Sequence, residues 1–197
     1  MNRNILNILL LPFFLPHFIL FRLHFRQMKD EVERWGEVLR IQKKDLNHLF
    51  LYLIMTLREF RSLFYFRMGK WGVILNCFMR GQEACHINPL GRYSYGRGLV
   101  IQHGHSMRLG AQSVGDNLQI WHNVTVGKDR PSGGRPIIGN NVMIFTGAVV
   151  LGNIKIGNNV KIGALSVVTK DVPDNCVVVG NPAYIVKRDG VKVREKL

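Results

Sequence analysis

Residues 138–168 read IGNNVMIFTGAVVLGNIKIGNNVKIGALSVV and carry an aliphatic residue at every sixth position. The repeated positions are Ile138, Ile144, Val150, Ile156, Ile162 and Val168. Glycine directly follows three of them, and a second, often smaller apolar side chain recurs at the same period. Neither an α-helix nor a β-hairpin has a period of six, whereas repetition at a fixed period is typical of solenoids.

Each six-residue unit fits one short strand and one corner of a β-solenoid. The aliphatic residue would point inward, and glycine or asparagine would permit the turn at the corner. Three units then close a coil of about eighteen residues, so that equivalent positions stack on one another. The same register extends backwards through Val126, Ile120 and Val114, and it breaks near Leu109. We therefore predict a solenoid core with a continuous aliphatic column.

A loop interrupts this register. Residues 128–136, KDRPSGGRP, contain no aliphatic residue that could point inward. The segment is therefore predicted to leave the coil, and loops carried by a regular scaffold are frequent binding sites. The array ends near residues 171–175, and Val177–Val179 are predicted to form one more strand.

The N-terminal segment is different in character. Residues 4–21 contain no charged side chain, but Pro12 and Pro16 argue against a clean transmembrane helix. Arg22, Arg26 and Lys29 follow directly, where anionic headgroups would lie. Residues 31–80 have helical periodicity and a basic, aromatic-rich second half. We expect membrane contact in this region, and a helical cap without lipid contact is the alternative.

The composition limits the classes of function. The chain has 27 Lys and Arg against 13 Asp and Glu, a net charge of +14 that attracts phosphate groups of nucleic acids, lipids or cofactors. No basic motif of a nucleic-acid-binding domain accompanies this charge, so we expect no nucleic-acid partner. Three cysteines are too few and too scattered for a disulfide framework, which indicates a reducing compartment.

Three short motifs carry a resemblance to a known family. They are Ile101-Gln102-His103-Gly104, Ser132-Gly133-Gly134 and Val178-Val179-Gly180-Asn181-Pro182-Ala183. Together with the repeats, residues 58–188 resemble the hexapeptide-repeat acyltransferases, in particular serine O-acetyltransferases and their surface-polysaccharide (colanic-acid-type) relatives. The resemblance implies a left-handed parallel β-helix with an N-terminal α-helical segment, a homotrimer with active sites between subunits, and acetyl transfer from acetyl-CoA to a hydroxyl.

The resemblance places the general base at His103. A hydroxyl is a poor nucleophile at neutral pH, and histidine is suited to removing its proton during attack on a thioester. His122 lies 19 residues later, about one coil further on, and is the alternative base. For coenzyme A, the resemblance implies that the pantetheine arm passes the small residues Thr146, Gly147 and Ala164. Lys170 and Lys187 are candidates for contacts with its phosphates.

The acceptor half of the expected site departs from the serine enzymes. Those enzymes have an aspartate directly before the catalytic histidine, where this chain has Gln102, and a second aspartate is replaced around His86. A further histidine in the loop is absent, since the chain reads Gly134-Arg135-Pro136. We therefore expect a sugar hydroxyl of surface-polysaccharide biosynthesis as acceptor, with serine as the alternative.

Two other classes remain open. A zinc enzyme of the carbonic anhydrase type would use histidines on such a solenoid, but the histidine spacing does not match a zinc constellation, so no metal is expected. A non-catalytic trimeric scaffold is the second. We expect three segments: residues 1–82, apolar and helical; residues 83–180, the acyltransferase solenoid; and residues 181–197, a basic tail. The expected location is cytoplasmic, with peripheral contact at the inner face of the cell membrane left open.

Overall fold

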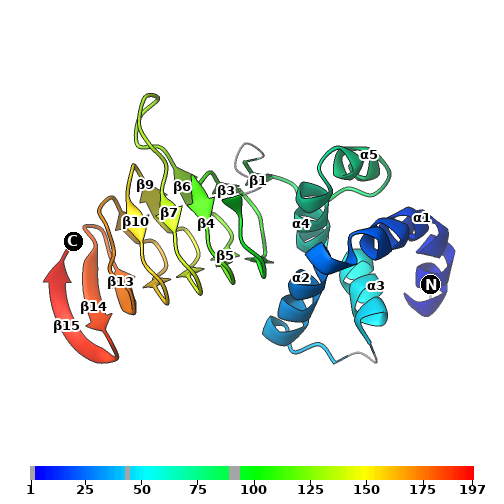
Figure 1. Ribbon diagram of the computed structural model, residues 1–197, viewed down its shortest axis with the longest axis horizontal. Coiled ribbons are helices and arrows are strands. Elements are labelled where there is room, and N and C mark those ends of the chain that lie inside the picture. Colours follow the sequence, from blue (N-terminus) through cyan, green and yellow to red (C-terminus); the bar gives the residue numbers. More distant parts are fainter. Residues whose placement is uncertain (1–2, 43–44, 89–93) are drawn as a thin grey trace. The chain divides into compact units, whose positions relative to one another are not determined.

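The computed structural model describes residues 3–42, 45–88 and 94–197. The chain divides into two compact units, Met1–Gln82 and Glu83–Leu197. The first unit is helical and the second is built of short strands (Figure 1).

The helices of the first unit pack around aromatic side chains. Their bounds are α1 Arg3–Leu23, α2 Phe25–Val38, α3 Leu46–Thr56, α4 Arg58–Met68 and α5 Lys70–Phe78. The rings of Phe21 and Phe50 stack with centroids 4.1 Å apart, and Phe60 and Phe64 are fully buried beside them. Asp45 is the N-cap of α3, because its carboxylate accepts hydrogen bonds from the backbone N–H groups of the first turn. The helical pattern predicted for residues 31–80 is thus present as four successive helices.

Helix α1 runs through both prolines without ending. Within the described ranges, no helix is both long and apolar enough to cross a bilayer. The inward side of α1 contains Phe14, His17 and Phe21. His17 Nε2 lies 2.9 Å from the hydroxyl oxygen of Tyr65, and burial lowers the pKa of His17 to about 4. This imidazole is therefore a neutral core residue near pH 7.

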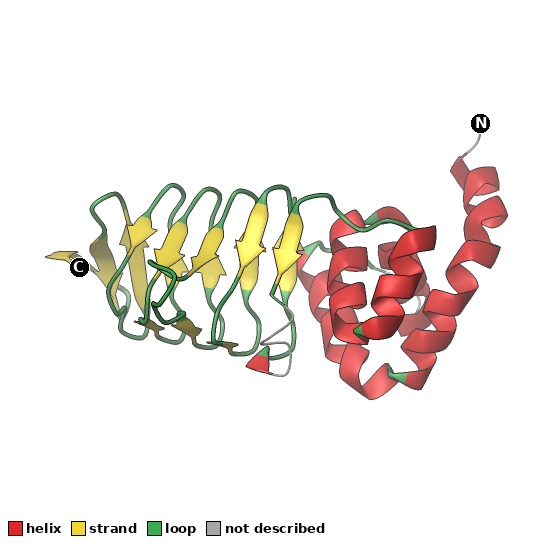
Figure 2. Cartoon of the chain, turned by 90° about the horizontal axis from the view of Figure 1, so that it is seen from above, coloured by secondary structure: helices red, strands yellow, loops and turns green. Residues whose placement is uncertain are grey.

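The second unit is a three-sided β-solenoid, seen as a row of stacked coils in Figure 2. Sheet A contains β1 Cys85–Ile87, β3 Met107–Leu109, β6 Thr125–Gly127, β9 Val149–Leu151 and β12 Val167–Val168. Sheet B contains β4 Ser113–Val114, β7 Ile137–Ile138 and β10 Lys155–Ile156. Sheet C contains β2 Val100–Gln102, β5 Gln119–Trp121, β8 Met143–Ile144, β11 Lys161–Ile162, β13 Cys176–Val179, β14 Tyr184–Arg188 and β15 Val191–Lys196.

The strand register confirms the predicted eighteen-residue coil. Ile138 pairs with Ile156, Ile144 with Ile162 and Val150 with Val168, each in parallel. These side chains are at most 2% exposed, so they form the continuous aliphatic column. Burying an aliphatic side chain of this size stabilises the fold by ~1.5–3 kcal/mol. The column is therefore the main source of stability in this unit.

The predicted break of the register near Leu109 is present as a shift by one residue: Leu109 is buried and pairs with Val126, and the coil continues through it. Within the basic segment 181–197, β14 and β15 extend sheet C as an antiparallel hairpin. The predicted strand at residues 177–179 is present as β13, and the loop 128–136 projects from the coil between β6 and β7 (Figure 1).

An asparagine ladder holds one corner of the stacked coils. Asn141, Asn159 and Asn175 all have a backbone φ of 55–57°. Asn159 Nδ2 donates to Asn175 Oδ1 at 2.8 Å, and Asn141 Nδ2 donates to Asn159 Oδ1 at 3.2 Å. Asparagine tolerates this left-handed conformation better than other residues with a side chain, apart from aspartate. The corner therefore needs both the conformational tolerance and the amide hydrogen bonds of asparagine.

We expect Asn159→Ala to destabilise the solenoid by ~1–2 kcal/mol, because alanine pays the left-handed backbone cost and breaks two ladder hydrogen bonds. Thermal unfolding followed by circular dichroism measures the effect. Lys161→Ala is the matched control, since Lys161 is exposed on the next strand of the same coil. Equal unfolding temperatures for the two variants would contradict this role of the ladder.

Candidate functional site

Two histidines lie together at the edge where sheet C turns into sheet A. His103 follows β2 and His122 follows β5, and these two strands are paired neighbours. The ring centroids are 5.9 Å apart and the ring planes are at 73°. His103 is exposed and has a φ of 58°, the left-handed conformation that recurs at other corners of the solenoid. The structure thus brings the two predicted base candidates together.

The second imidazole has an unusual environment. Within the part of the chain that the structure describes, Nδ1 of His122 is buried and has no hydrogen-bond partner. Buried polar atoms are usually paired in folded proteins, so this nitrogen can take one further hydrogen bond. The ring of His122 lies beside that of His103 on the same edge. The pair can therefore serve as a general base and a group that orients it.

Three predicted cofactor residues continue the same edge on later coils. The backbone N–H of Gly147 donates to the carbonyl of His122 at 3.1 Å, and that of Leu165 donates to the carbonyl of Thr146 at 3.0 Å. Ala164 lies in the turn just before Leu165 and is exposed. Gly147 has a φ of 69°, and a Cβ there would lie 2.7 Å from Leu165 Cδ2. The edge thus presents two histidines and then a column of small residues.

The two predicted phosphate contacts lie elsewhere on the solenoid. Lys170 follows β12 and is therefore beyond the opposite end of that strand from the histidine edge. Lys187 lies in β14, where it pairs with Val177 and Lys192. Both lysines are exposed near the C-terminal coils, and neither joins the column of Thr146, Gly147 and Ala164.

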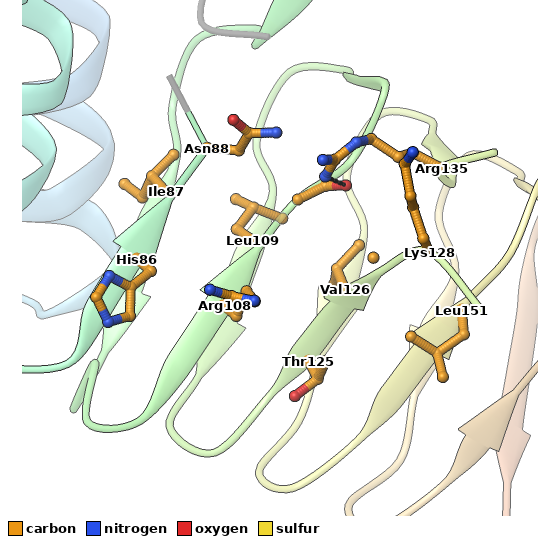
Figure 3. A pocket seen from close by; sticks show the side chains of 12 residues that line it. His86, Ile87, Asn88, Arg108, Leu109, Thr125, Val126, Lys128, Arg135 and Leu151 are labelled. Carbon is orange, nitrogen blue, oxygen red and sulfur yellow. Dashed lines mark hydrogen bonds between the residues drawn. The ribbon is translucent and has the colours of Figure 1, made fainter. Parts of the chain in front are cut away.

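A pocket of about 500 Å³ lies against sheet A and the loop 128–136 (Figure 3). His86 on β1, Arg108 on β3 and Thr125 on β6 occupy paired positions on neighbouring strands. Lys128 and Arg135 come from the loop. Sequence analysis identified the loop as a binding candidate but did not identify Arg108, because a single outward arginine on a strand has no motif of its own.

Two of the three cations of the loop donate hydrogen bonds to carbonyl oxygens. Arg135 Nη1 donates to the carbonyl of Gly110 at 2.8 Å, and Lys128 Nζ donates to the carbonyl of Pro131 at 2.9 Å. Gly110 leaves room for the first contact, since a Cβ there would lie 2.6 Å from Arg135 Nη1. Figure 3 shows Arg135 reaching this oxygen above β3. The hydrogen bond of Arg135 therefore ties the end of the loop to the coil, whereas that of Lys128 lies within the loop.

Over the described ranges, no group of three or more His, Cys, Asp or Glu side chains is placed to hold a metal ion. His86, His103 and His122 lie on three different segments, and only the last two have neighbouring rings.

Known proteins share the repeat and the fold. Residues 135–170 match the bacterial transferase hexapeptide (six repeats) family. Over 155 residues the chain is 46% identical to serine acetyltransferase of Synechococcus elongatus, which covers 73% of this chain and 63% of that protein. The chain therefore spans less than two thirds of the length of this relative.

Solved structures of serine acetyltransferases also align with this chain. Serine acetyltransferase of Neisseria gonorrhoeae aligns with a TM-score of 0.65 and 31% identity, over 85% of this chain and 66% of that chain. A serine acetyltransferase of Brucella abortus in complex with coenzyme A aligns with a TM-score of 0.65 and 26% identity, over 85% of this chain and 69% of that chain. The similarity thus includes most of this chain.

Proposed function

We propose that this chain, whose solenoid carries the hexapeptide repeats of bacterial transferases, is an acetyl-CoA-dependent O-acetyltransferase. The main support for this proposal is the pair of His103 and His122, whose ring centroids are 5.9 Å apart. The small residues Thr146, Gly147 and Ala164 follow this pair along the same edge on later coils. A similar protein binds coenzyme A, and the relatives are named serine acetyltransferases. From the resemblance to hexapeptide-repeat acyltransferases we also propose that the solenoid is left-handed and that the protein forms a homotrimer.

In the proposed reaction His103 removes the proton of the acceptor hydroxyl as its oxygen attacks the thioester carbonyl. The tetrahedral oxyanion then collapses, the carbon–sulfur bond breaks, and the imidazolium returns the proton to the thiolate. The products are an acetyl ester and coenzyme A. His122 orients the His103 ring or shares its proton, and it is the alternative base. Thr146, Gly147 and Ala164 leave space along the edge for the pantetheine arm, while Lys170 and Lys187 remain candidates for the nucleotide phosphates.

We expect His103→Asn to reduce the rate of acetyl transfer by ~10²–10⁴-fold, because the imidazole proposed to remove the hydroxyl proton is lost. His105→Asn is the matched control, since His105 is exposed in the same corner and outside the ring pair. Transfer of radiolabelled acetyl groups measures the rate, and calorimetry with coenzyme A should show unchanged donor binding. Full turnover by His103→Asn would disprove its role as the base.

The acceptor has two candidates. Serine is the acceptor that the comparisons favour, because the relatives are named for it; this ranking differs from the sequence-based expectation of a sugar. A sugar hydroxyl stays the second candidate, because Gln102 and His86 stand where the serine enzymes have aspartates. Acetylation rates with serine, hexoses and N-acetylhexosamines separate the two candidates. Acetylation of none of these, nor of a phosphorylated hydroxyl compound, would contradict the proposed function itself.

The helical unit supports a proposal on location. Helices α1 and α5 form an apolar groove of about 610 Å³ lined by Pro12, Phe13, Pro16, Ile19, Leu20, Leu23, Trp71, Ile74, Leu75 and Phe78. Neither helix contains an acidic residue, and Lys70 Nζ lies 5.5 Å from the ring centroid of Trp71 at the rim. An apolar face with a basic, aromatic rim matches the interface of an anionic bilayer. We propose peripheral membrane contact through this groove.

We expect the full chain to sediment with vesicles that contain anionic lipid and less with neutral vesicles. Ile74→Ser with Phe78→Ser should abolish sedimentation, because both side chains are at least 50% exposed in the groove. Val191→Ser is the control, since Val191 is an exposed apolar residue of the solenoid. Absence of sedimentation, with oligomers that the double variant disrupts, would instead assign the groove to contacts between copies.

A further inference from the structure

The pocket on sheet A collects positive charge. Its lining includes the cations Arg108, Lys128 and Arg135 and the imidazole of His86, and no lining residue that the structure describes is acidic. The nearest acidic residue of the loop, Asp129, is outside the lining and lies beside Gly133 and Gly152. Cations gathered without a carboxylate repel one another, so the empty arrangement favours an anionic ligand.

The strand register places two of these side chains next to each other. His86 and Arg108 are directly paired on the parallel strands β1 and β3, which places their backbones about 4.8 Å apart. Within the described ranges, neither side chain has a hydrogen bond or ion pair to a protein group. An anion bound between them would accept a charge-assisted hydrogen bond from Arg108 and a further hydrogen bond from the imidazole.

The charge and size of the pocket identify the class of anion. Three cations and one imidazole exceed what a single carboxylate neutralises, whereas a phosphate ester or pyrophosphate carries about two negative charges and several acceptor oxygens. A volume of about 500 Å³ lies in the range that holds a ligand much larger than an amino acid. Ile87 and Leu151 add partly exposed apolar walls, and the hydroxyl of Thr125 adds a polar group.

The pocket adjoins the proposed site of chemistry. The corner that contains His103 leads directly into β3, which carries Arg108, and the corner that contains His122 leads into β6, which carries Thr125. A ligand held at Arg108 is therefore one short strand from the histidine edge on the same coils. We propose that this pocket binds the phosphate or pyrophosphate group of the acceptor, so that the acceptor is a phosphate-bearing hydroxyl compound such as an activated sugar. This inference rests on the proposed acetyl transfer.

Calorimetry of the full chain with inorganic pyrophosphate tests the pocket directly. We expect saturable binding that Arg108→Gln weakens at least tenfold, because one cation of the pocket lining is lost. Lys161→Gln is the matched control; it removes the same charge from an exposed position on β11 and should leave binding unchanged. Equal weakening by both variants, or no binding, would overturn the proposal.

Kinetics test whether the anion belongs to the acceptor. Pyrophosphate should compete with a nucleoside-diphosphate hexose as acceptor and not with acetyl-CoA, and Arg108→Gln should raise the KM of that acceptor at least tenfold. A raised KM for acetyl-CoA alone would place the donor's phosphates in the pocket and overturn the proposal. If Arg108→Gln and Lys161→Gln acetylate serine equally well and neither acetylates the phosphorylated acceptor, the phosphate-pocket proposal is wrong. The proposed acetyltransferase function would still stand.

The two levels of the proposal fail in different ways. If pyrophosphate binding depends on Arg108 but no hydroxyl compound is acetylated, then the proposed function is wrong and the assignment of the pocket to an acceptor falls with it. If acetyl transfer depends on His103 but pyrophosphate does not bind, then the function stands and the anion pocket is wrong.

Discussion

The inward aliphatic column is the constraint on which the rest of this unit depends. A coil of about eighteen residues cannot bury its own apolar side chains, so each coil is stable only against the next. The pairing of Ile144 with Ile162 and of Val150 with Val168 fixes the rotation of each coil on its neighbour. Because this rotation is fixed, residues about one coil apart in the sequence lie side by side on the surface.

This stacking explains how scattered residues form one edge. His103 and His122 are 19 residues apart, and their corners follow the paired strands β2 and β5. Thr146, Gly147 and Ala164 reach the same edge because hydrogen bonds join each corner to the next. The small side chains of this edge contribute little to stability, because the buried aliphatic column inside the coil supplies most of it. The edge is therefore free to carry chemistry.

Sheet A, the face beside this edge, carries the positively charged pocket. Sheet A presents His86 and Arg108 at paired, exposed positions, where both side chains can donate hydrogen bonds to an anion. The loop 128–136 adds two further cations, and its hydrogen bond to Gly110 holds it against this face. Serine is the acceptor suggested by the relatives, whereas the charge of this pocket suggests a larger anionic acceptor.

The sequence alone determined the solenoid, the excursion of the loop and the histidine candidates, because a period of six leaves no other regular fold for the aliphatic residues. It could not place Lys170 and Lys187, since their distance from the edge depends on which side of the prism they occupy. It also missed the hairpin of β14 and β15, whose pairing shows no six-residue repeat. Only the tertiary structure decided the pairing of His86 with Arg108 and the hydrogen bond from Arg135 to the carbonyl of Gly110. The reason is that a strand register and a long-range hydrogen bond join residues that no local sequence pattern connects.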